Sequence, residues 1–212
     1  MLLISDFLFQ QFSSYDPIYL YLELIAVFFG LLSVWFAKNN NIAVYPTGII
    51  STLIFVYLLY QQNLMGDMLI NGYYFIMSIY GWYIWSRNKK GESIYKISYL
   101  NSSDKIKSII LFVISIVFVL TIYFTVEIKL TIIPIIDTLT TGIFFVGMWM
   151  MAKRKIENWI MWIIGDLISI PLYFYKGMFF TSLQYLIFTI IAIYGILSWK
   201  KIYNSRMERN LK

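Results

Sequence analysis

The sequence predicts an all-α membrane protein with seven transmembrane helices. The first observation is composition: 60% of the 212 residues are hydrophobic and 13% are charged, whereas a soluble domain carries about a quarter charged residues. The second is that long apolar runs recur along the chain, each sufficient to cross a hydrocarbon core of about 30 Å. The mean hydropathy of +0.71 agrees, because it leaves too little polar surface to face water.

Polar or glycine-containing breaks separate several of these runs, such as Asn-Asn-Asn at residues 39–41. The longest polar gap, RNKKGESIYKISYLNSSDKI at residues 87–106, is expected to form a loop with an interfacial helix. Residues 1–17 lack the basic start of a signal peptide and are predicted to form an interfacial segment. The predicted helices span residues 18–37, 44–61, 68–86, 107–125, 131–152, 158–175 and 180–199.

The basic residues are distributed unevenly over the connections between these helices. If the N-terminus is outside, 15 of the 17 lysines and arginines lie on the inner side, and only Lys129 and Lys176 lie outside. Because basic loops stay in the cytoplasm, this bias predicts an outer N-terminus, a cytoplasmic C-terminus and an odd number of spans. The net charge of +6 has the same explanation and does not require nucleic acid as a partner.

The two halves of the chain resemble each other weakly. Glu23 precedes Trp35 by twelve residues, as Asp137 precedes Trp149. The next helices begin with Asn-x6-Gly at 41–48 and 158–165, and the third helices end with Tyr-Gly-x3-Trp at 80–85 and 194–199. The offsets of 114, 117 and 114 residues predict two copies that differ by a three-residue insertion. Coincidence among glycines and aromatic residues is the alternative.

Two copies of three helices separated by one helix have the same orientation, as in transporters built on parallel repeats. The repeat divides the chain into five parts. These are an N-terminal interfacial segment (1–17), a first three-helix bundle (18–86), a loop and linker helix (87–130), a second three-helix bundle (131–199) and a cytoplasmic basic tail (200–212).

An aspartate interrupts the apolar stretch NWIMWIIGDLISIP at residues 158–171. Asp166 follows Asn158 by eight residues, roughly 12 Å along a helix, and so lies near the middle of the sixth span. A charged carboxylate at that depth costs about 3 kcal/mol on insertion. We therefore expect Asp166 to face the bundle interior, either in a binding site or as a hydrogen-bond acceptor between helices.

Polar and aromatic residues recur at spacings of three and four in the second, third and sixth predicted helices, so each set shares one helix face. The seventh helix offers Gln184 and Tyr185. Indole and phenol faces attract flat cations, a carboxylate supplies the counter-charge, and amides and hydroxyls bind ligand hydroxyls. The predicted ligand is small, planar, hydroxylated and cationic. The predicted binding residues are Asn158, Trp162, Asp166, Ser169, Tyr45, Thr52, Asn71, Tyr74, Ser78, Trp82, Gln184 and Tyr185.

Simpler roles exist for some of these side chains and their neighbours. Tryptophans near span ends, such as Trp85, Trp159 and Trp199, are typical of the membrane interface. Glycine and serine on a helix face often only permit close packing.

Enzyme signatures are missing from the sequence. Without cysteine or histidine there are no disulfides, thiol nucleophiles or imidazole bases, and almost every type of zinc site is excluded. P-loop, HExxH and GxSxG motifs are absent as well. We therefore expect no enzymatic activity, no metal and no cofactor; an intramembrane enzyme with Asp166 as a base is the minor alternative.

Three long runs, at residues 44–87, 155–177 and 183–201, resemble the PnuC family of bacterial vitamin transporters. The resemblance implies a 3+1+3 core of seven helices, similar to the SWEET sugar transporters, in a homotrimer in the bacterial inner membrane. It also implies facilitated diffusion of nicotinamide riboside, with trapping by a cytoplasmic kinase that feeds NAD biosynthesis. The family motifs contain Asn158, Trp162, Asp166, Tyr74, Ser78, Trp82 and Gln184.

The resemblance leaves the vitamin open. Nicotinamide riboside and thiamine are both flat cations with hydroxyl groups, whereas riboflavin is neutral, larger and a poorer match for Asp166. We predict nicotinamide riboside; thiamine uptake is the alternative within the family. A membrane receptor or scaffold that binds without transporting is the alternative of a different class.

Overall fold

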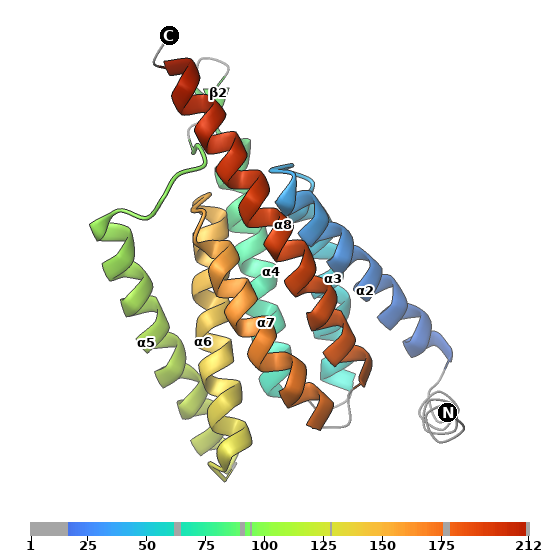
Figure 1. The fold of residues 1–212 in the computed structure, drawn as a ribbon. Coiled ribbons are helices and arrows are strands. Elements are labelled where there is room, and N and C mark those ends of the chain that lie inside the picture. The colour runs from blue at the N-terminus through green and yellow to red at the C-terminus, as the bar shows by residue number, and fades with distance from the viewer. Residues whose placement is uncertain are drawn as a thin grey trace.

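The computed structural model describes residues 17–61, 65–89, 92–93, 95–127, 129–175 and 179–210. Residues 1–16, which hold nearly all of the predicted interfacial segment, lie outside this part of the chain. Within it, seven helices lie side by side, and the only strands are a two-residue antiparallel pair, β1 (Asn88–Lys89) and β2 (Glu92–Ser93) (Figure 1). The helices are α2 (Pro17–Lys38), α3 (Val44–Gln61), α4 (Met65–Ser86), α5 (Ser102–Thr125), α6 (Ile132–Ala152), α7 (Asn158–Tyr175) and α8 (Phe179–Asn210).

The prediction of seven helices in an all-α chain is confirmed for the described residues, with two main differences at helix ends and one in the connection 87–106. Helix α5 begins at Ser102 rather than 107, because Asn101 and Asp104 form a reciprocal capping box there. Helix α8 continues to Asn210 through the predicted basic tail, which contains no glycine or proline to end it. The predicted interfacial helix within 87–106 is wrong for the described residues, which form the β-hairpin and an extended segment.

Five of the described helices are long and apolar enough to cross a membrane: α2, α3, α5, α6 and α8. Helices α4 and α7 are not among them. These two carry the polar and aromatic stripes that the sequence singles out, including Asn71, Ser78, Asn158 and Asp166, and such residues lower the hydropathy of the segment. Their polar residues therefore need neighbours inside the bundle.

The helices pack in a defined order (Figure 1). Helix α3 packs on both α2 and α4, and α7 packs on both α6 and α8. Between these two triplets, α4 contacts α6 and α2 contacts α8. Helix α5 runs along α6 at one edge of the bundle, where a Cβ on Gly142 would lie 2.8 Å from the Phe112 ring. Each triplet therefore meets the other along two helix pairs.

The turns that end α2 and α6 have the same backbone geometry. Asn40 and Arg154 both adopt positive φ, 51° and 52°. The amide of Asn40 bonds to Ala37 and that of Arg154 to Met151, and most of the neighbouring turn bonds recur at the same offset of 114 residues. The predicted three-residue insertion is therefore wrong: the turns match without a gap. The alignment of Asn41 with Asn158 is wrong, since the turn hydrogen bonds show that Val44 is the backbone equivalent of Asn158.

When the two triplets are aligned at the offset of 114 residues, an aromatic ring lies on a glycine at equivalent positions in each. The Tyr45 ring occupies the space where Gly81 would carry a Cβ, and a Cβ on Gly195 would lie 2.6 Å from the Trp159 ring. Tyr45 meets Trp85 edge-on, with ring centroids 5.1 Å apart, and Trp159 meets its equivalent Trp199 at 5.5 Å. The same close contact thus recurs 114 residues apart.

These rings are buried, so the expectation that Trp85, Trp159 and Trp199 face the membrane interface is wrong. They are 3%, 1% and 0% exposed. The Trp85 indole donates a hydrogen bond to the Ala152 carbonyl of α6 at 3.0 Å, and the Trp199 indole donates one to the Ala37 carbonyl of α2 at 2.9 Å. Each bond joins the third helix of one triplet to the end of the first helix of the other.

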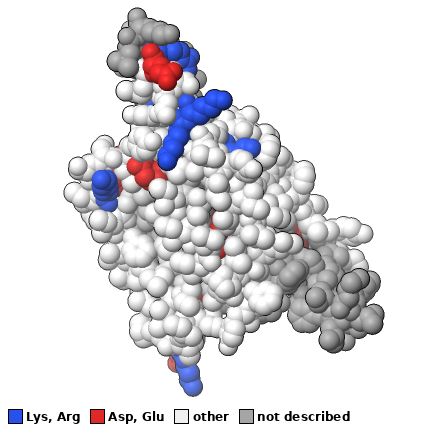
Figure 2. Space-filling view, viewed as in Figure 1, with Lys and Arg blue, Asp and Glu red and all other residues white. Residues whose placement is uncertain are grey.

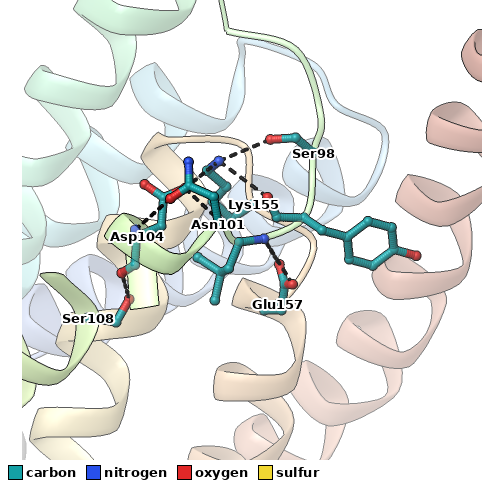
Figure 3. A network of polar contacts seen from close by, with 8 residues as sticks. Ser98, Asn101, Asp104, Ser108, Lys155 and Glu157 are labelled. Carbon is teal, nitrogen blue, oxygen red and sulfur yellow. Dashed lines mark hydrogen bonds and ion pairs between the residues drawn. The ribbon is translucent and has the colours of Figure 1, made fainter. Parts of the chain in front are cut away.

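The extended segment 95–101, here named the strap, ties α5 to the turn between α6 and α7 (Figure 3). Its Ser98 amide and carbonyl bond to Arg154 and Ile156 of that turn. The Lys155 ammonium lies 2.7 Å from the Asp104 carboxylate at the start of α5, and the Glu157 carboxylate accepts the Leu100 amide. The basic turn is thus held by neighbouring polar groups at the end of the bundle.

We predict that Trp85→Phe lowers the free energy of unfolding by about 1–2 kcal/mol, since it leaves the buried Ala152 carbonyl without its indole donor. Trp199→Phe should cost less, about 1 kcal/mol, because the Ala37 carbonyl keeps its bond from the Asn40 amide. Thermal unfolding of the purified protein in detergent measures this. Trp35→Phe is the control, because that indole is half exposed, and its effect should stay within about 0.5 kcal/mol. Equal effects at all three positions would contradict a structural role for the two hydrogen bonds.

Candidate functional site

The candidate site centres on Asp166, in the middle of α7. Its side chain is 2% exposed, and its Oδ2 atom has no hydrogen-bond partner within the described residues. Ser169, one turn further along, is 1% exposed, and its hydroxyl lacks a partner there as well. A buried polar atom without a partner is costly, so such atoms often mark a place where another molecule binds. Both side chains face the protein interior, as predicted.

Aromatic rings from four helices surround this part of α7. Trp162 lies one turn before Asp166, stacked on Phe144 of α6 with centroids 5.5 Å apart and planes at 28°. Phe144 also stacks on Tyr185 of α8, at 6.0 Å and 7°. Tyr74 of α4 lies 6.4 Å from Trp162. A charge on Asp166 would interact electrostatically with the hydroxyls of both Tyr74 and Tyr185, so the carboxyl lies within electrostatic range of the two side chains.

Contacts between helices hold these rings in place. The Tyr73 hydroxyl donates to the Phe145 carbonyl at 3.0 Å, and the two rings stack with centroids 3.7 Å apart, which fixes α4 against α6. Tyr173 of α7 lies 5.1 Å from Tyr185 and shares a hydrogen bond with it. Large rings joined in this way lose little freedom when a ligand arrives, so the site is largely preformed.

Small residues make the close approach of α6 and α7 possible. The Phe144 ring occupies the space of the missing Gly165 side chain, directly on the α7 backbone. A Cβ on Gly147 would lie 3.5 Å from the Trp162 indole. The stack of rings therefore depends on two glycines, one on each helix.

The structure brings some of the predicted residues together. Trp162, Asp166, Tyr74 and Tyr185 lie in one cluster, with Ser169 on the same side of α7. Asn71, one turn before Tyr74, and Gln184, beside Tyr185, are half-buried. That these side chains bind a substrate stays a prediction.

Other predicted residues lie elsewhere. Tyr45 belongs to the ring cluster with Trp85. Asn158, fully buried at the start of α7, donates to the Lys155 carbonyl two turns from Asp166. The Thr52 hydroxyl donates to its own helix, at Gly48, and Ser78 is buried with its hydroxyl close to the same glycine. The Trp82 side chain is 41% exposed, although its neighbours on that face of α4 are buried.

Sequence reasoning missed four aromatic residues of the cluster: Tyr73, Phe144, Phe145 and Tyr173. Phe144 and Phe145 lie in an apolar helix where phenylalanine looks like ordinary core. The sequence signal that singles out Phe144 is the constant offset of 114 residues. At this offset Phe144 aligns with Gly30, so a large ring stands where the first half of the chain has a glycine.

Taken together, the cluster offers one carboxyl, one free hydroxyl and several ring faces away from water. Such a set has the chemistry to attract a flat cation by charge and by stacking. Within the described residues, no group of three or more acidic, histidine or cysteine side chains has the arrangement to hold a metal ion.

Comparison with known proteins points to one family. A sequence profile described as nicotinamide mononucleotide transporter matches residues 20–201. The nicotinamide riboside transporter PnuC of Escherichia coli (strain K12) is 28% identical to this chain, over 89% of the chain and 87% of that protein. The PnuC of Neisseria mucosa is 25% identical, over 86% and 73%.

A third relative has a different substrate in its name. The riboflavin/roseoflavin transporter RibM of Streptomyces davaonensis is 21% identical, over 90% of this chain and 89% of that protein. The crystal structure of the vitamin B3 transporter PnuC superposes with a TM-score of 0.66 at 22% identity, covering 87% of this chain and 83% of that one. That likeness shows a shared fold.

We predict that Asp166→Asn raises the free energy of unfolding of the ligand-free protein by about 1–2 kcal/mol, because the neutral amide costs less to bury than an uncompensated carboxylate. Thermal unfolding without any vitamin present measures this, with Glu23→Gln, a carboxylate on α2, as the control. A loss of stability at Asp166 alone would return this residue to the role of a structural acceptor between helices.

Proposed function

The chain belongs to the nicotinamide mononucleotide transporter family, the family of PnuC, and on that premise we propose that it carries nicotinamide riboside across the membrane. Proteins of this family are membrane transporters, so the chain is a transporter and not an enzyme. The observation that supports the choice of substrate is the buried Asp166 beside Trp162, Tyr74 and Tyr185.

Nicotinamide riboside matches this cluster group by group. Its pyridinium ring is a flat cation, which the carboxylate neutralises and the indole and phenol faces attract. Its ribose hydroxyls can bond to Ser169 and to the half-buried amides of Asn71 and Gln184. A cation that compensates a buried carboxylate gains more than it would in water, because the interior screens charge weakly.

The alternative vitamins are compared by their charge and their fit to the Asp166 carboxylate. Thiamine is also a flat cation with a hydroxyl group, so the carboxylate favours it equally, and only the names of the relatives favour nicotinamide riboside. Riboflavin, named for the relative RibM, is neutral and would leave the buried carboxylate uncompensated. Asp166 therefore supports a cationic vitamin over a neutral one.

We propose that the helices form two parallel three-helix bundles, α2–α4 and α6–α8, joined by α5 as a linker, with a pseudo-two-fold axis along the membrane normal. Three paired features support this arrangement. The positive-φ turns at Asn40 and Arg154 are spaced 114 residues apart, as are the ring-on-glycine contacts. The indole hydrogen bonds of Trp85 and Trp199 run from each triplet to the other.

The proposal includes all seven helices as membrane spans, with the C-terminus in the cytoplasm of a bacterial cell and the chain in its inner membrane. Lys and Arg gather at the end of the bundle where α8 finishes, and the surface between the two ends is almost free of charge (Figure 2). Basic residues favour the cytoplasmic side, which supports this orientation.

We propose facilitated diffusion, with the vitamin resting near the midplane and a cytoplasmic kinase trapping it after release. The buried rings of Tyr45, Trp85, Trp159 and Trp199 fill the interior at the basic end. Release into the cytoplasm therefore requires this ring cluster to part. Assembly as a homotrimer is part of the proposal on the family resemblance alone.

We predict that Asp166→Asn weakens binding of nicotinamide riboside by more than tenfold, about 1.4 kcal/mol, since the cation loses its counter-charge. Titration calorimetry on the purified protein with nicotinamide riboside, thiamine and riboflavin measures this. Glu23→Gln should bind like the wild type. Tight thiamine binding without a response to nicotinamide riboside would replace the proposed substrate, and unchanged affinity in folded Asp166→Asn would remove the carboxylate from the site.

We predict that proteoliposomes loaded with unlabelled nicotinamide riboside accumulate the labelled vitamin transiently by counterflow, without ATP or an ion gradient. Counterflow needs a protein that exposes its site to both sides, so a receptor or scaffold gives none. Empty liposomes provide the background. Binding by the purified protein without counterflow would support the receptor, and uptake only under an imposed ion gradient would contradict facilitated diffusion.

A further inference from the structure

The constant offset of 114 residues aligns Phe144 with Gly30 and Gly165 with Ser51. In the first triplet, a Cβ on Gly30 would lie 3.1 Å from the Ser51 hydroxyl, so two small residues meet there. In the second triplet, the Phe144 ring lies on Gly165 at the equivalent contact. In both triplets the first and second helices come close at this contact, but only in the second triplet does an aromatic ring occupy it.

The same comparison distinguishes the neighbouring positions. Trp162 corresponds to Gly48, and Asp166 corresponds to Thr52, whose hydroxyl bonds to its own helix. The first triplet therefore lacks both the ring and the carboxyl. Phe144, Trp162 and Asp166 thus have no counterparts of the same type in the first triplet.

Phe144 is nearly parallel to two neighbouring rings. Its ring centroid lies 5.5 Å from that of Trp162 and 6.0 Å from that of Tyr185, with planes at 28° and 7°. It is 7% exposed, and its ring lies on Gly165, which precedes Asp166 in the chain. A ring that packs on a helix backbone and against two other rings has little freedom to tilt, so it restricts the plane of the neighbouring indole.

We propose that Phe144 is a positioning residue: seated on Gly165, it sets the plane of the Trp162 indole so that the ring of a flat cationic ligand stacks on it beside Asp166. This inference rests on the proposed function for the identity of the ligand. Phe144 acts on the ligand through Trp162 and thereby determines selectivity for flat rings.

Two substitutions at Phe144 distinguish the effect of a flat ring from the effect of side-chain volume. Phe144→Met keeps a large apolar side chain but removes the flat ring, and Phe144→Tyr keeps the ring. A side chain that only fills space tolerates methionine well. Gly165→Ala leaves Phe144 in the sequence but adds a Cβ where its ring lies. The control is Phe112→Met, since Phe112 lies on Gly142 on the side of α6 that faces α5.

The first measurement needs no ligand. Acrylamide quenching of the Trp162 emission, obtained by subtracting the spectrum of the matching Trp162→Phe variant, reports how firmly the indole is held. We expect quenching to increase at least about twofold in Phe144→Met and Gly165→Ala, because each loses a ring contact. It should stay at the wild-type level in Phe144→Tyr and Phe112→Met. Unchanged quenching in both Phe144→Met and Gly165→Ala overturns the positioning role.

The second measurement is the dissociation constant for nicotinamide riboside. An aligned aromatic contact contributes up to about tenfold in affinity, so we expect a three- to tenfold rise in Phe144→Met and Gly165→Ala. Phe144→Tyr and Phe112→Met should stay within about twofold of the wild type. Equal affinity in Phe144→Met and the wild type overturns the proposal. If the wild type binds no nicotinamide riboside, the proposed function fails, while the quenching result still decides the role of Phe144.

Discussion

Two indole hydrogen bonds hold the two halves of this protein together at one end. The last carbonyls of a helix lack partners within it, and those of Ala152 and Ala37 belong to buried residues, so donors from other parts of the protein stabilise them. Trp85 and Trp199 supply one each, to Ala152 and Ala37, and both bonds run from the third helix of one triplet to the first helix of the other. With these ends fixed, the remaining contacts between the triplets have a defined register.

The two triplets share this scaffold but differ in what fills it. In the first, serine hydroxyls bond to helix carbonyls, Ser33 to Val44 and Ser51 to Ala26, and the helices approach over small residues. In the second, rings and a carboxyl occupy the interior. A structural repeat does not require a repeated site, because the backbone contacts that define the fold lie at the helix ends, while the side chains between them are free to diverge.

The helices were predictable because apolar runs and polar breaks mark them directly. That Trp162 and Asp166 share a face of α7 followed from their spacing, and the inward direction of that face followed from the cost of a buried charge. The spacing of residues identifies a face, but not which helix lies opposite it. That is why Tyr45 joins a different cluster and Trp82 is exposed. The predicted alignment of the two halves was wrong at the second helix for a related reason. It paired Asn41 with Asn158 because both are asparagine, whereas the turn hydrogen bonds match Asn158 to Val44.

Helix α7 carries side chains of both the candidate site and the ring cluster at the basic end. Trp159 belongs to the ring cluster that fills the basic end, and Trp162, only about 4.5 Å further along the helix axis, belongs to the stack beside Asp166. Both side chains are attached to one hydrogen-bonded helix, so a rotation or tilt of α7 that accommodates a ligand at Trp162 also moves Trp159 on Gly195. A ligand shifts a conformational equilibrium only through differential contacts with its two states. Under the proposed function, α7 is the element that would carry such contacts from Trp162 to the ring cluster at the basic end.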